Sequence, residues 1–464
     1  MHYVSTRGQA PVLTFEETML TGLASDGGLY VPETVPTMTE EAISDLSRLD
    51  YEQVAFEVMK PFIGDTFSDA EFHEIIGDAY RGFGHIARAP LKQIDGPLWL
   101  CELFHGPTLA FKDFAMQLIG QMFQRVLARR GERITIVGAT SGDTGSAAIE
   151  AFRGLENVDV FILYPHGRVS EVQRRQMTTP SEANVHALAV EGTFDDCQRH
   201  LKDMFAHAAF RDGVRLAAVN SINWARVMAQ IVYYFTAATA LGAPHRPTRF
   251  CVPTGNFGDI YAGHIAKRMG LQIEGLLVAT NQNDILRRAM VTGDYSVGEV
   301  KPSISPSMDI QVSSNFERLL FDALGRDGAA VAALMDDLKA KGGFRIPENA
   351  RVAIKGMGFD AGSATEESTR EQIAQTLKGS GELLCPHTAV GVDVAITNMA
   401  TGCPTVVLAT AHPAKFPDAV EAATGIRPPL PNRMADLYDR SERLTAVPND
   451  VETIETLIQE RIAH

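Results

Sequence analysis

The feature that most constrains the fold of this chain is a regular alternation of short apolar runs with helical patterns, which begins near residue 97. A long helical pattern from Phe114 to Arg130 ends at Gly131, a residue that commonly closes helices. Short buried strands are then expected at Ile134–Val137, Val158–Leu163, Val185–Val190, Val214–Val219, Phe250–Val252, Leu276–Ala279 and Thr405–Ala409. Strands that alternate with helices in this way predict an α/β fold, with a mostly parallel sheet covered by helices on both faces.

Two parts of the chain depart from this alternation. Residues 1 to about 90 carry helical patterns near 50–61 and 69–82 without strands between them. The stretch from about 300 to 380 is less regular and is interpreted as an insertion packed on the main body. A chain of 464 residues is too long for one ordinary domain, so we expect two or three.

Charge and cysteine usage exclude several classes of partner. The formal net charge is −15, which disfavours nucleic acid and anionic membranes, so an anionic substrate would need positive groups gathered locally in the site. The five cysteines are scattered and form no CxxC pair, which favours reduced thiols and a cytoplasmic location. The start of the chain lacks the pattern of a signal peptide, and no apolar run approaches the roughly 20 residues of a membrane span.

The segment HGPTLAFKDFAMQ, which starts at His105, places Lys112 where a loop gives way to a helix. Apolar neighbours such as Phe111 and Phe114 can lower the pKa of a lysine, and a neutral amine is the nucleophile that forms a Schiff base. Most lysines are simply solvated, so this pattern alone also fits a surface lysine at a helix start.

Two glycine-rich turns follow expected strands. The first, GATSGDTGSAA from Gly138, offers backbone amides and hydroxyl groups to an anion at the start of the next helix. The second, PTGNFGD from Pro253, could hold a phosphate group on Gly255, Asn256, Phe257 and Gly258. Either turn could equally be a tight strand-to-helix connection, and neither matches a Walker loop.

Two further patterns do not predict a site. Gly356 to Ala361 fits GxGxxA after a possible strand at Arg351–Ile354, but the acidic residue that a dinucleotide site needs at the end of the second strand is missing. His387, His412 and Cys385 match no zinc spacing, so no metal site is predicted.

Taken in order, HGPTLAFKDF, TSGDTG, NSINWAR, PTGNFGD and TAHPAKF resemble the threonine synthase family. The start of the chain, YVSTRG with SDGGLYVP, and the segment SPSMDIQVSSNFERLLF from Ser305 resemble it too, so the similarity covers nearly the whole chain. The insertion is similar to that of the longer branch found in bacteria and fungi. One departure is Cys385, where the family pattern leads us to expect Asp before Pro-His-Thr.

The resemblance implies the tryptophan-synthase β-like fold, fold type II of the enzymes that use pyridoxal 5′-phosphate (PLP). It implies an N-terminal accessory domain of residues 1–92, a large PLP-binding domain of 93–125 and 225–464 with the insertion at about 300–380, and a small α/β domain of 126–224. The implied reaction is the last step of threonine biosynthesis, in which O-phospho-L-homoserine and water give L-threonine and phosphate. A monomer or small homo-oligomer is expected.

The resemblance also implies roles for individual residues. Lys112 matches the lysine that binds PLP covalently, and the catalytic acid–base group is expected to be the same lysine. Thr410 matches a hydroxyl that faces the pyridine nitrogen. Asp143 matches a group near the phenolic oxygen of the cofactor. The cofactor phosphate is assigned to Gly255, Asn256, Phe257 and Gly258. Candidate substrate-binding residues are Thr108, Thr140, Ser141, Thr144, Asn220, Ser221, Asn223 and Arg226.

Three alternatives stay open at this point. A related PLP-dependent lyase, such as a serine or threonine dehydratase, would release a keto acid from a hydroxyamino acid. A phosphohomoserine lyase would act on the same substrate without adding water productively. A non-catalytic member of the fold would bind a ligand without turnover, although Lys112 and both glycine-rich turns being intact argues against it.

Overall fold

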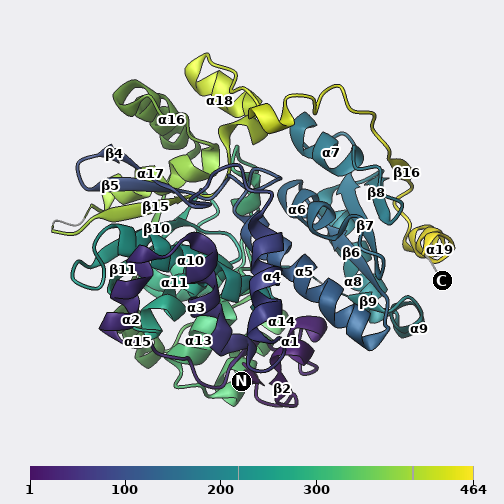
Figure 1. Cartoon of the computed structure of the whole chain (residues 1–464), viewed down its shortest axis with the longest axis horizontal. Coiled ribbons are helices and arrows are strands. Elements are labelled where there is room, and N and C mark those ends of the chain that lie inside the picture. The colour runs from purple at the N-terminus through teal and green to yellow at the C-terminus, as the bar shows by residue number, and fades with distance from the viewer. Residues whose placement is uncertain (218, 400–401, 463–464) are drawn as a thin grey trace.

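The computed structural model describes residues 1–217, 219–399 and 402–462, and it is built around two separate sheets, one mostly and one wholly parallel. The larger sheet has six strands in the order β14-β11-β10-β15-β5-β4, and the second has five in the order β16-β8-β7-β6-β9. Figure 1 shows the two sheets on opposite sides of the molecule, with helices around and between them. This arrangement confirms the predicted α/β class.

The larger sheet collects strands from distant parts of the sequence. Its members are β4 (Leu91–Asp95), β5 (Leu98–Glu102), β10 (Thr248–Pro253), β11 (Ile273–Thr280), β14 (Phe359–Ser363) and β15 (Thr405–Ala409). All neighbouring pairs are parallel except β4 with β5. Because β5, β10 and β15 run in the same direction, the loops that follow them leave from one edge of the sheet, where ligands bind in open α/β sheets.

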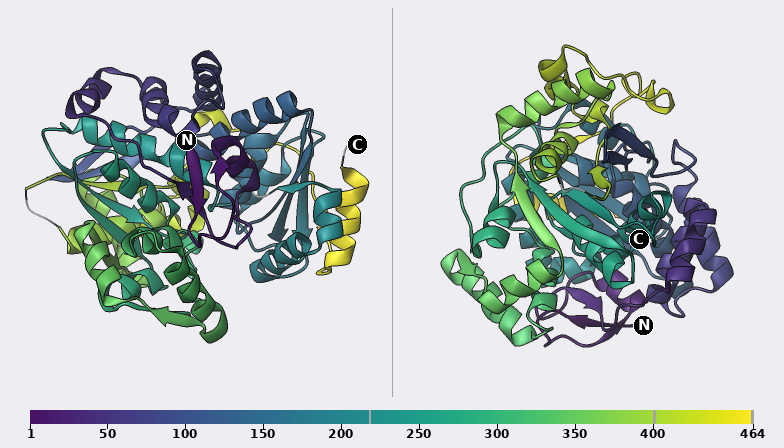
Figure 2. Two further views of the ribbon diagram at one scale, coloured as in Figure 1. Left: turned by 90° about the horizontal axis from the view of Figure 1, so that it is seen from below. Right: turned by 90° about the vertical axis from the view of Figure 1, so that its left-hand side faces the viewer.

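The second sheet is wholly parallel. It consists of β6 (Ile134–Ala139), β7 (Val158–Pro165), β8 (Val185–Val190), β9 (Leu216–Ala217) and β16 (Thr445–Val447). Its strand β16 and the following helix come from the C-terminus, so the end of the chain returns to the sheet formed by residues 134–217 (Figure 2). The domain boundaries stay a prediction.

Helices cover both sheets. They are α1 (Phe15–Thr21), α2 (Glu40–Asp45), α3 (Tyr51–Ile63), α4 (Asp69–Tyr80), α5 (Lys112–Arg130), α6 (Asp143–Phe152), α7 (Glu171–Thr178), α8 (Phe194–Ala206), α9 (Ala208–Gly213), α10 (Trp224–Ala240), α11 (Gly258–Arg268), α12 (Ile285–Thr292), α13 (Phe316–Ala323), α14 (Gly328–Lys341), α15 (Glu348–Gly356), α16 (Glu366–Ser380), α17 (Pro386–Thr397), α18 (Pro417–Thr424) and α19 (Val451–Arg461). Short 3₁₀ turns are η1 (Leu46–Arg48), η2 (Pro306–Met308), η3 (Pro413–Lys415) and η4 (Asn432–Met434). Within the described ranges, no helix combines the length and the apolar character needed to cross a membrane.

Helix α10 forms the centre of the molecule. Almost all of its side chains are buried, as expected for a helix that is apolar on every side, and it packs against α3, α5 and α11. A small antiparallel sheet of β1 (His2–Ser5), β2 (Leu13–Thr14) and β3 (Tyr30–Pro32) and helices α1 to α4 precede the alternating part of the chain. The remaining pair, β12 (Asp294–Ser296) with β13 (Gly343–Arg345), lies in the predicted insertion.

Two expectations about strands need correction. Residues Arg351–Ile354 lie inside helix α15, where Ala350 and Ile354 point inward one turn apart while Val352 is 63% exposed, a helical rather than a strand period. The strand expected at Val214–Val219 is shortened to Leu216–Ala217, because Arg215 takes a left-handed backbone with φ 51°. Residue 218, within that expected strand, lies outside the described residues.

Candidate active site

Lys112 is the first residue of α5 and lies in a nearly closed environment. Its side chain is 12% exposed, its Nζ is 3.6 Å from Oδ2 of Asp143, and it lies over the Phe111 ring at 4.5 Å. Burial lowers the pKa of the Lys112 ammonium, Asp143 opposes that effect, and the cations Arg226 and Lys415 add to it. A lysine in this setting is easily converted to the neutral, nucleophilic amine.

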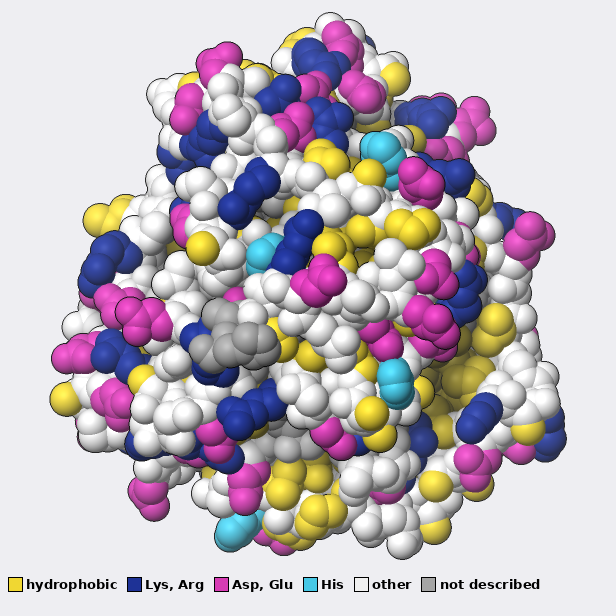
Figure 3. All heavy atoms as spheres, turned by 90° about the vertical axis from the view of Figure 1, so that its right-hand side faces the viewer, with side chains coloured by type: hydrophobic (Ala, Val, Ile, Leu, Met, Phe, Trp, Pro, Cys, Tyr) yellow, Lys and Arg dark blue, Asp and Glu magenta, His cyan; other side chains and the backbone are white. Residues whose placement is uncertain are grey.

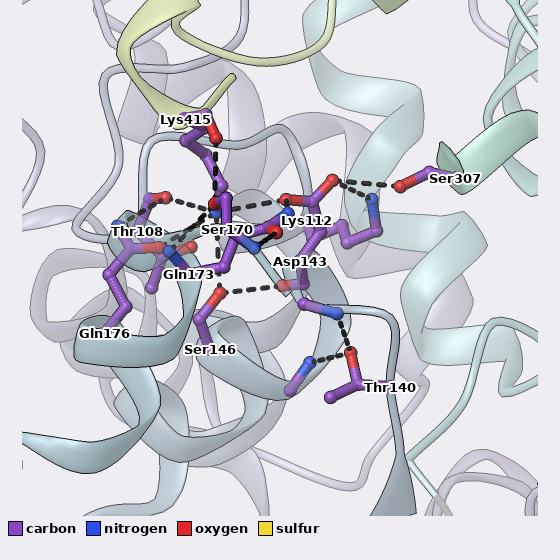
Figure 4. Close-up of polar contacts among 12 residues, drawn as sticks. Thr108, Lys112, Thr140, Asp143, Ser146, Ser170, Gln173, Gln176, Ser307 and Lys415 are labelled. Atoms are coloured by element: carbon purple, nitrogen blue, oxygen red, sulfur yellow. Dashed lines mark hydrogen bonds and ion pairs between the residues drawn. The ribbon is translucent and has the colours of Figure 1, made fainter. Parts of the chain in front are cut away.

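Asp143 lies at the start of α6 and connects several elements of the site. Its Oδ1 accepts a hydrogen bond from Gln173 Nε2 at 3.0 Å, and its Oδ2 accepts one from Ser307 Oγ at 3.0 Å (Figure 4). Burial alone would raise the pKa of Asp143, but Lys415 and Lys112 outweigh it and hold that pKa well below its usual range. Asp143 is therefore a permanent anion.

The turn between β10 and α11 has the features of a phosphate cradle. Among the described residues, no hydrogen bond is made by the amide N–H of Gly255, Asn256 or Phe257, and that of Gly258 lies in the first turn of α11. Phe257 adopts a left-handed backbone with φ 65°, which is rare for an aromatic residue and typical of strained functional turns. Free amides at a helix start fit the phosphate of PLP.

Gly255 is needed in this turn because another segment approaches it closely. A Cβ atom at Gly255 would lie 2.6 Å from the carbonyl oxygen of Ser307. The turn is also supported from outside, since Ser313 Oγ donates to the Gly255 carbonyl at 2.7 Å. The residues present therefore fit the cofactor that the motif predicts.

Thr410 follows β15 at the same edge of the sheet and is buried. Its carbonyl oxygen accepts a hydrogen bond from the N–H of Phe111 at 2.9 Å, and Ala411 pairs with Ala110 beside it. The motif that contains Lys112 and the motif that contains Thr410 are thus joined by their backbones.

The predicted substrate residues of the first glycine-rich turn are partly engaged in local structure. Thr140 Oγ1 accepts hydrogen bonds from the N–H groups of Gly142 and Gly145, each at 2.9 Å, and so shapes the turn before α6. Ser141 and Thr144 are half-buried. Thr140, Thr144 and Asn220 line a common cavity of about 50 Å³, so the structure brings these three together.

The segment before α10 is tied to the phosphate cradle. Asn315, which is not among the residues predicted for the site, is fully buried and donates from Nδ2 to the carbonyl oxygens of Ser221 at 3.1 Å and Asn256 at 2.8 Å. Its place in the segment SSNFERLLF was the available signal, but nothing in the sequence indicated its partners. Ser221 Oγ is 3.4 Å from Ser314 Oγ.

Two predicted substrate residues have side chains that are already committed. Asn223 caps α10 by accepting from Ala225 N at 3.0 Å, and its Nδ2 donates to the Met19 carbonyl at 2.7 Å. Thr108 Oγ1 donates to Asp113 Oδ1 at 2.6 Å. Their direct contact with substrate stays a prediction, and the structure gives both a supporting role.

Arg226 lies in the first turn of α10 and is buried without a compensating acid. It is 4% exposed, its Nε has no hydrogen-bond partner, and no carboxylate among the described residues lies within ion-pair distance. Burial lowers the pKa of Arg226 to about 10, which still leaves the guanidinium charged at neutral pH. A buried cation without a partner is costly unless a ligand supplies the anion.

His387 and Cys385, which match no zinc spacing, have structural contacts in the site. His387 Nε2 accepts a hydrogen bond from Ser307 N at 3.3 Å, and burial lowers the pKa of His387 to about 4, so that its ring is neutral. Cys385 caps α17 by accepting from Thr388 N at 3.4 Å. An aspartate would cap a helix in the same way, which accounts for the departure from the family pattern at this position.

Comparison with known proteins covers the same regions. The family model described as threonine synthase N terminus matches residues 2–80, the model for pyridoxal-phosphate dependent enzymes matches 83–338, and the model for the threonine synthase C-terminal part matches 388–458. A threonine synthase of Pseudomonas aeruginosa is 55% identical over 462 residues, which cover 99% of this chain and 98% of that protein.

Two solved structures are similar over nearly the whole chain. The crystal structure of PLP-bound threonine synthase from Brucella melitensis has a TM-score of 0.97 at 56% identity and covers 99% of each chain. The structure of threonine synthase from yeast has a TM-score of 0.94 at 39% identity, covering 99% of this chain and 98% of that one.

Proposed function

This chain belongs to the threonine synthase family, and on that basis we propose that it converts O-phospho-L-homoserine and water to L-threonine and phosphate, the last step of threonine biosynthesis. Its cofactor is PLP. The observation that carries the proposal is the pair of Lys112 and Asp143 next to the turn Gly255–Gly258. Ser307 connects the two, because its Oγ donates to Asp143 and its carbonyl oxygen lies against Gly255.

The cofactor is assigned to residues in the turns and helix starts next to both sheets. Lys112 Nζ is the amine that holds it covalently, and the free amides of Gly255, Asn256, Phe257 and Gly258 bind its phosphate. Thr410 offers a neutral hydroxyl to the ring nitrogen, and Asp143 is the acidic group on the side of Lys112. Support comes from the backbone contact between Phe111 and Thr410 and from the absence of room for a side chain at Gly255.

Arg226 is the proposed ligand of the substrate phosphate. Its guanidinium is buried, charged and free of an acidic partner within the described residues, so a phosphate would supply the missing negative charge. The hydroxyl groups of Thr140, Ser141 and Thr144 and the side chains of Asn220 and Ser221 are the candidates for the remaining substrate contacts.

The chemistry requires a sink for the electrons released when substrate C–H bonds break, and bound PLP supplies it. Lys112 Nζ, once free of the cofactor, is the base placed to take the proton from the substrate α-carbon and to return it later. Asp143 forms an ion pair with that amine at 3.6 Å, and the low exposure of both side chains keeps bulk water away from it. Thr410, as a hydroxyl rather than a carboxylate, leaves the pyridine nitrogen largely neutral, which favours elimination over transamination.

The positive charge needed for an anionic substrate is concentrated inside the molecule. Lys415 and Arg226 are buried around the site and Lys112 is largely buried there, although the chain as a whole carries a net charge of −15. On the face shown in Figure 3, basic and acidic side chains are interspersed over the surface. The local cations would hold a doubly anionic substrate.

A product assay tests this function and its two nearest alternatives. Purified protein, PLP and O-phospho-L-homoserine are expected to yield threonine and inorganic phosphate in equal amounts. Phosphate accompanied by a keto acid instead of threonine would indicate a phosphohomoserine lyase. Keto acid formed from threonine or serine, without turnover of the phosphorylated substrate, would indicate a dehydratase.

The cellular location of the enzyme is inferred from its cysteines and its relatives. The five cysteines are buried and unpaired, and the related proteins act in amino-acid biosynthesis, so we place the enzyme in the cytoplasm. Fractionation of the source cells with an antibody against the chain would test this location.

A further inference from the structure

Two lysines, one largely and one fully buried, share one carboxylate at the centre of the site. Lys112 Nζ is 3.6 Å from Asp143 Oδ2, and Lys415 Nζ is 3.2 Å from Asp143 Oδ1. The three side chains are 12%, 0% and 4% exposed, for Lys112, Lys415 and Asp143 respectively. One negative charge cannot fully compensate two buried positive charges, so one of the two lysines is the better site for a proton.

Lys415 has acceptors for all three of its N–H bonds. Besides its ion pair with Asp143 Oδ1, its Nζ donates to the Thr108 carbonyl at 2.8 Å, to Gln176 Oε1 at 3.1 Å and to Ser146 Oγ at 3.5 Å (Figure 4). The orientation of Gln176 is fixed, because its Nε2 donates to the same Thr108 carbonyl at 3.1 Å. A neutral amine would leave these acceptors partly unsatisfied, so the pocket is built for an ammonium.

Lys112 lacks such a set of acceptors. Its nearest anionic oxygen, Asp143 Oδ2, is beyond the range of a good hydrogen bond, and its other neighbour is the face of the Phe111 ring. Asp143 Oδ2 also accepts from Ser307 Oγ at 3.0 Å, a closer partner than Lys112. The carboxylate is therefore engaged mainly by groups other than Lys112.

We propose that Lys415 is a positioning residue for the reaction: a fully buried amino group that engages Oδ1 of Asp143 and so makes Lys112 the lysine that gives up its proton. Lys415 touches neither substrate nor cofactor in this role. It acts through Asp143, which it keeps ionised and shares with Lys112.

The other charged groups around Lys112 do not change which of the two lysines loses its proton. Arg226 on α10 adds positive charge and lowers the pKa of Lys112 further. Asp259 on α11 is a weak anion, since burial raises its pKa to about 7, and His387 on α17 is neutral, since burial lowers its pKa to about 4. The adjacent Asp113 on α5 has a pKa raised by burial, and its carboxylate accepts from Thr108.

The inference rests on the proposed function of Lys112, and its test uses a readout that does not depend on turnover. The chain is first stripped of PLP. Its fold is then checked by circular dichroism and by recovery of activity when PLP is restored. The rate of trace acetylation of Lys112 is then followed against pH by peptide mass spectrometry. Exposed Lys339 is the internal reference in the same sample.

In the unaltered chain the labelling midpoint of Lys112 is expected to lie below that of Lys339. Lys415→Met removes the competing cation, so Asp143 becomes available to Lys112 and the midpoint is expected to rise by about one pH unit or more. Lys415→Arg keeps the charge and is expected to leave the midpoint near that of the unaltered chain.

An unchanged or lower midpoint in Lys415→Met overturns the proposal, as does a midpoint for Lys112 at or above that of Lys339 in the unaltered chain. Lys415→Gln replaces Lys415→Met if the latter does not fold, and the comparison with Lys339 needs no variant. A separate experiment distinguishes failure of the proposed function from failure of this inference. If Lys112 is not the cofactor lysine, PLP that borohydride reduces onto the chain will map to a different lysine.

Discussion

The backbone N–H of Phe111 donates to the carbonyl oxygen of Thr410 at 2.9 Å, which joins the start of α5 to the end of β15. Lys112 directly follows Phe111. The backbone atoms that carry the Lys112 and Thr410 side chains are therefore held together by a backbone hydrogen bond. Two further backbone bonds, from Leu103 to Ala409 and from His412 to Leu109, lie on either side of it. Such a rigid frame is what keeps a cofactor ring fixed between its covalent anchor and its ring-nitrogen partner.

Replacing Lys112 by alanine is expected to abolish threonine formation while leaving non-covalent PLP binding in place. The change removes both the covalent anchor and the acid–base group but leaves the phosphate turn intact, so kcat should fall by about 10³-fold or more. Steady-state kinetics and a PLP-binding titration measure the two effects. Lys339→Ala, at an exposed position of α14, is the control. Near-normal turnover in Lys112→Ala would contradict the assignment.

Gly255→Ala is expected to weaken PLP binding. The new Cβ would lie 2.6 Å from the Ser307 carbonyl oxygen, a backbone atom that cannot move without shifting η2 and the contacts of Asp143 and His387. We expect the Kd for PLP to rise by about tenfold or more, the equivalent of about 1.4 kcal/mol. Equilibrium titration of the stripped chain measures it.

The matched control is Gly356→Ala at the end of α15, where an added Cβ meets nothing within 4 Å. This control variant should bind PLP as the unaltered chain does. If Gly255→Ala also binds PLP normally, the turn after β10 is not the phosphate site.

The sequence pattern was sufficient for the fold class and for most strands and helices, because buried parallel strands and amphipathic helices have distinct periods. Thr405–Ala409 matches β15 residue for residue, whereas Arg351–Ile354 was misassigned because four apolar-rich residues are too few to separate a strand from one turn of helix. Local patterns identify elements reliably only when they are long.

Contacts between distant segments were beyond the sequence pattern. Lys415 lies in the quoted motif TAHPAKF, yet nothing in its neighbours shows that it is fully buried against Asp143, Thr108 and Gln176. Asn315 is similar, since its two partners lie in segments far from it in the chain. Such roles depend on how α6, η3 and the phosphate turn pack, and no local composition encodes that packing.

The neutral state of His387 predicts a specific loss of stability in acid. Its pKa is lowered by burial from 6.5 to about 4 in the folded chain, so the unfolded chain binds a proton at a higher pH than the folded chain does. Stability from this group is therefore fully present above about pH 6.5 and is lost as the pH falls toward about 4. At about pH 5 the loss should be about 2 kcal/mol.

His387→Gln keeps an acceptor for Ser307 N and removes the titrating ring. The free energy of urea unfolding, measured near pH 7 and near pH 5, should fall less in this variant than in the unaltered chain, by about 2 kcal/mol. His2→Gln, at an exposed position of β1, is the control and should leave the pH dependence unchanged. Equal acid sensitivity in His387→Gln and the unaltered chain would show that His387 is not the group responsible.

Arg226→Ala is expected to weaken binding of O-phospho-L-homoserine far more than binding of PLP. Arg226 is buried and charged with no acidic partner in the described part of the chain, while the cofactor phosphate has its own set of amides at Gly255–Gly258. A charge-assisted bond to phosphate contributes about 1.5–3 kcal/mol, so KM should rise roughly 10- to 150-fold while the Kd for PLP changes little. Arg287→Ala, at a partly exposed arginine of α12 paired with Asp284, is the matched control and should change neither constant. A KM that stays the same, or a loss confined to PLP affinity, would mean that the substrate phosphate binds elsewhere. The buried Arg226 guanidinium would then still need an anion other than the substrate phosphate to compensate its charge.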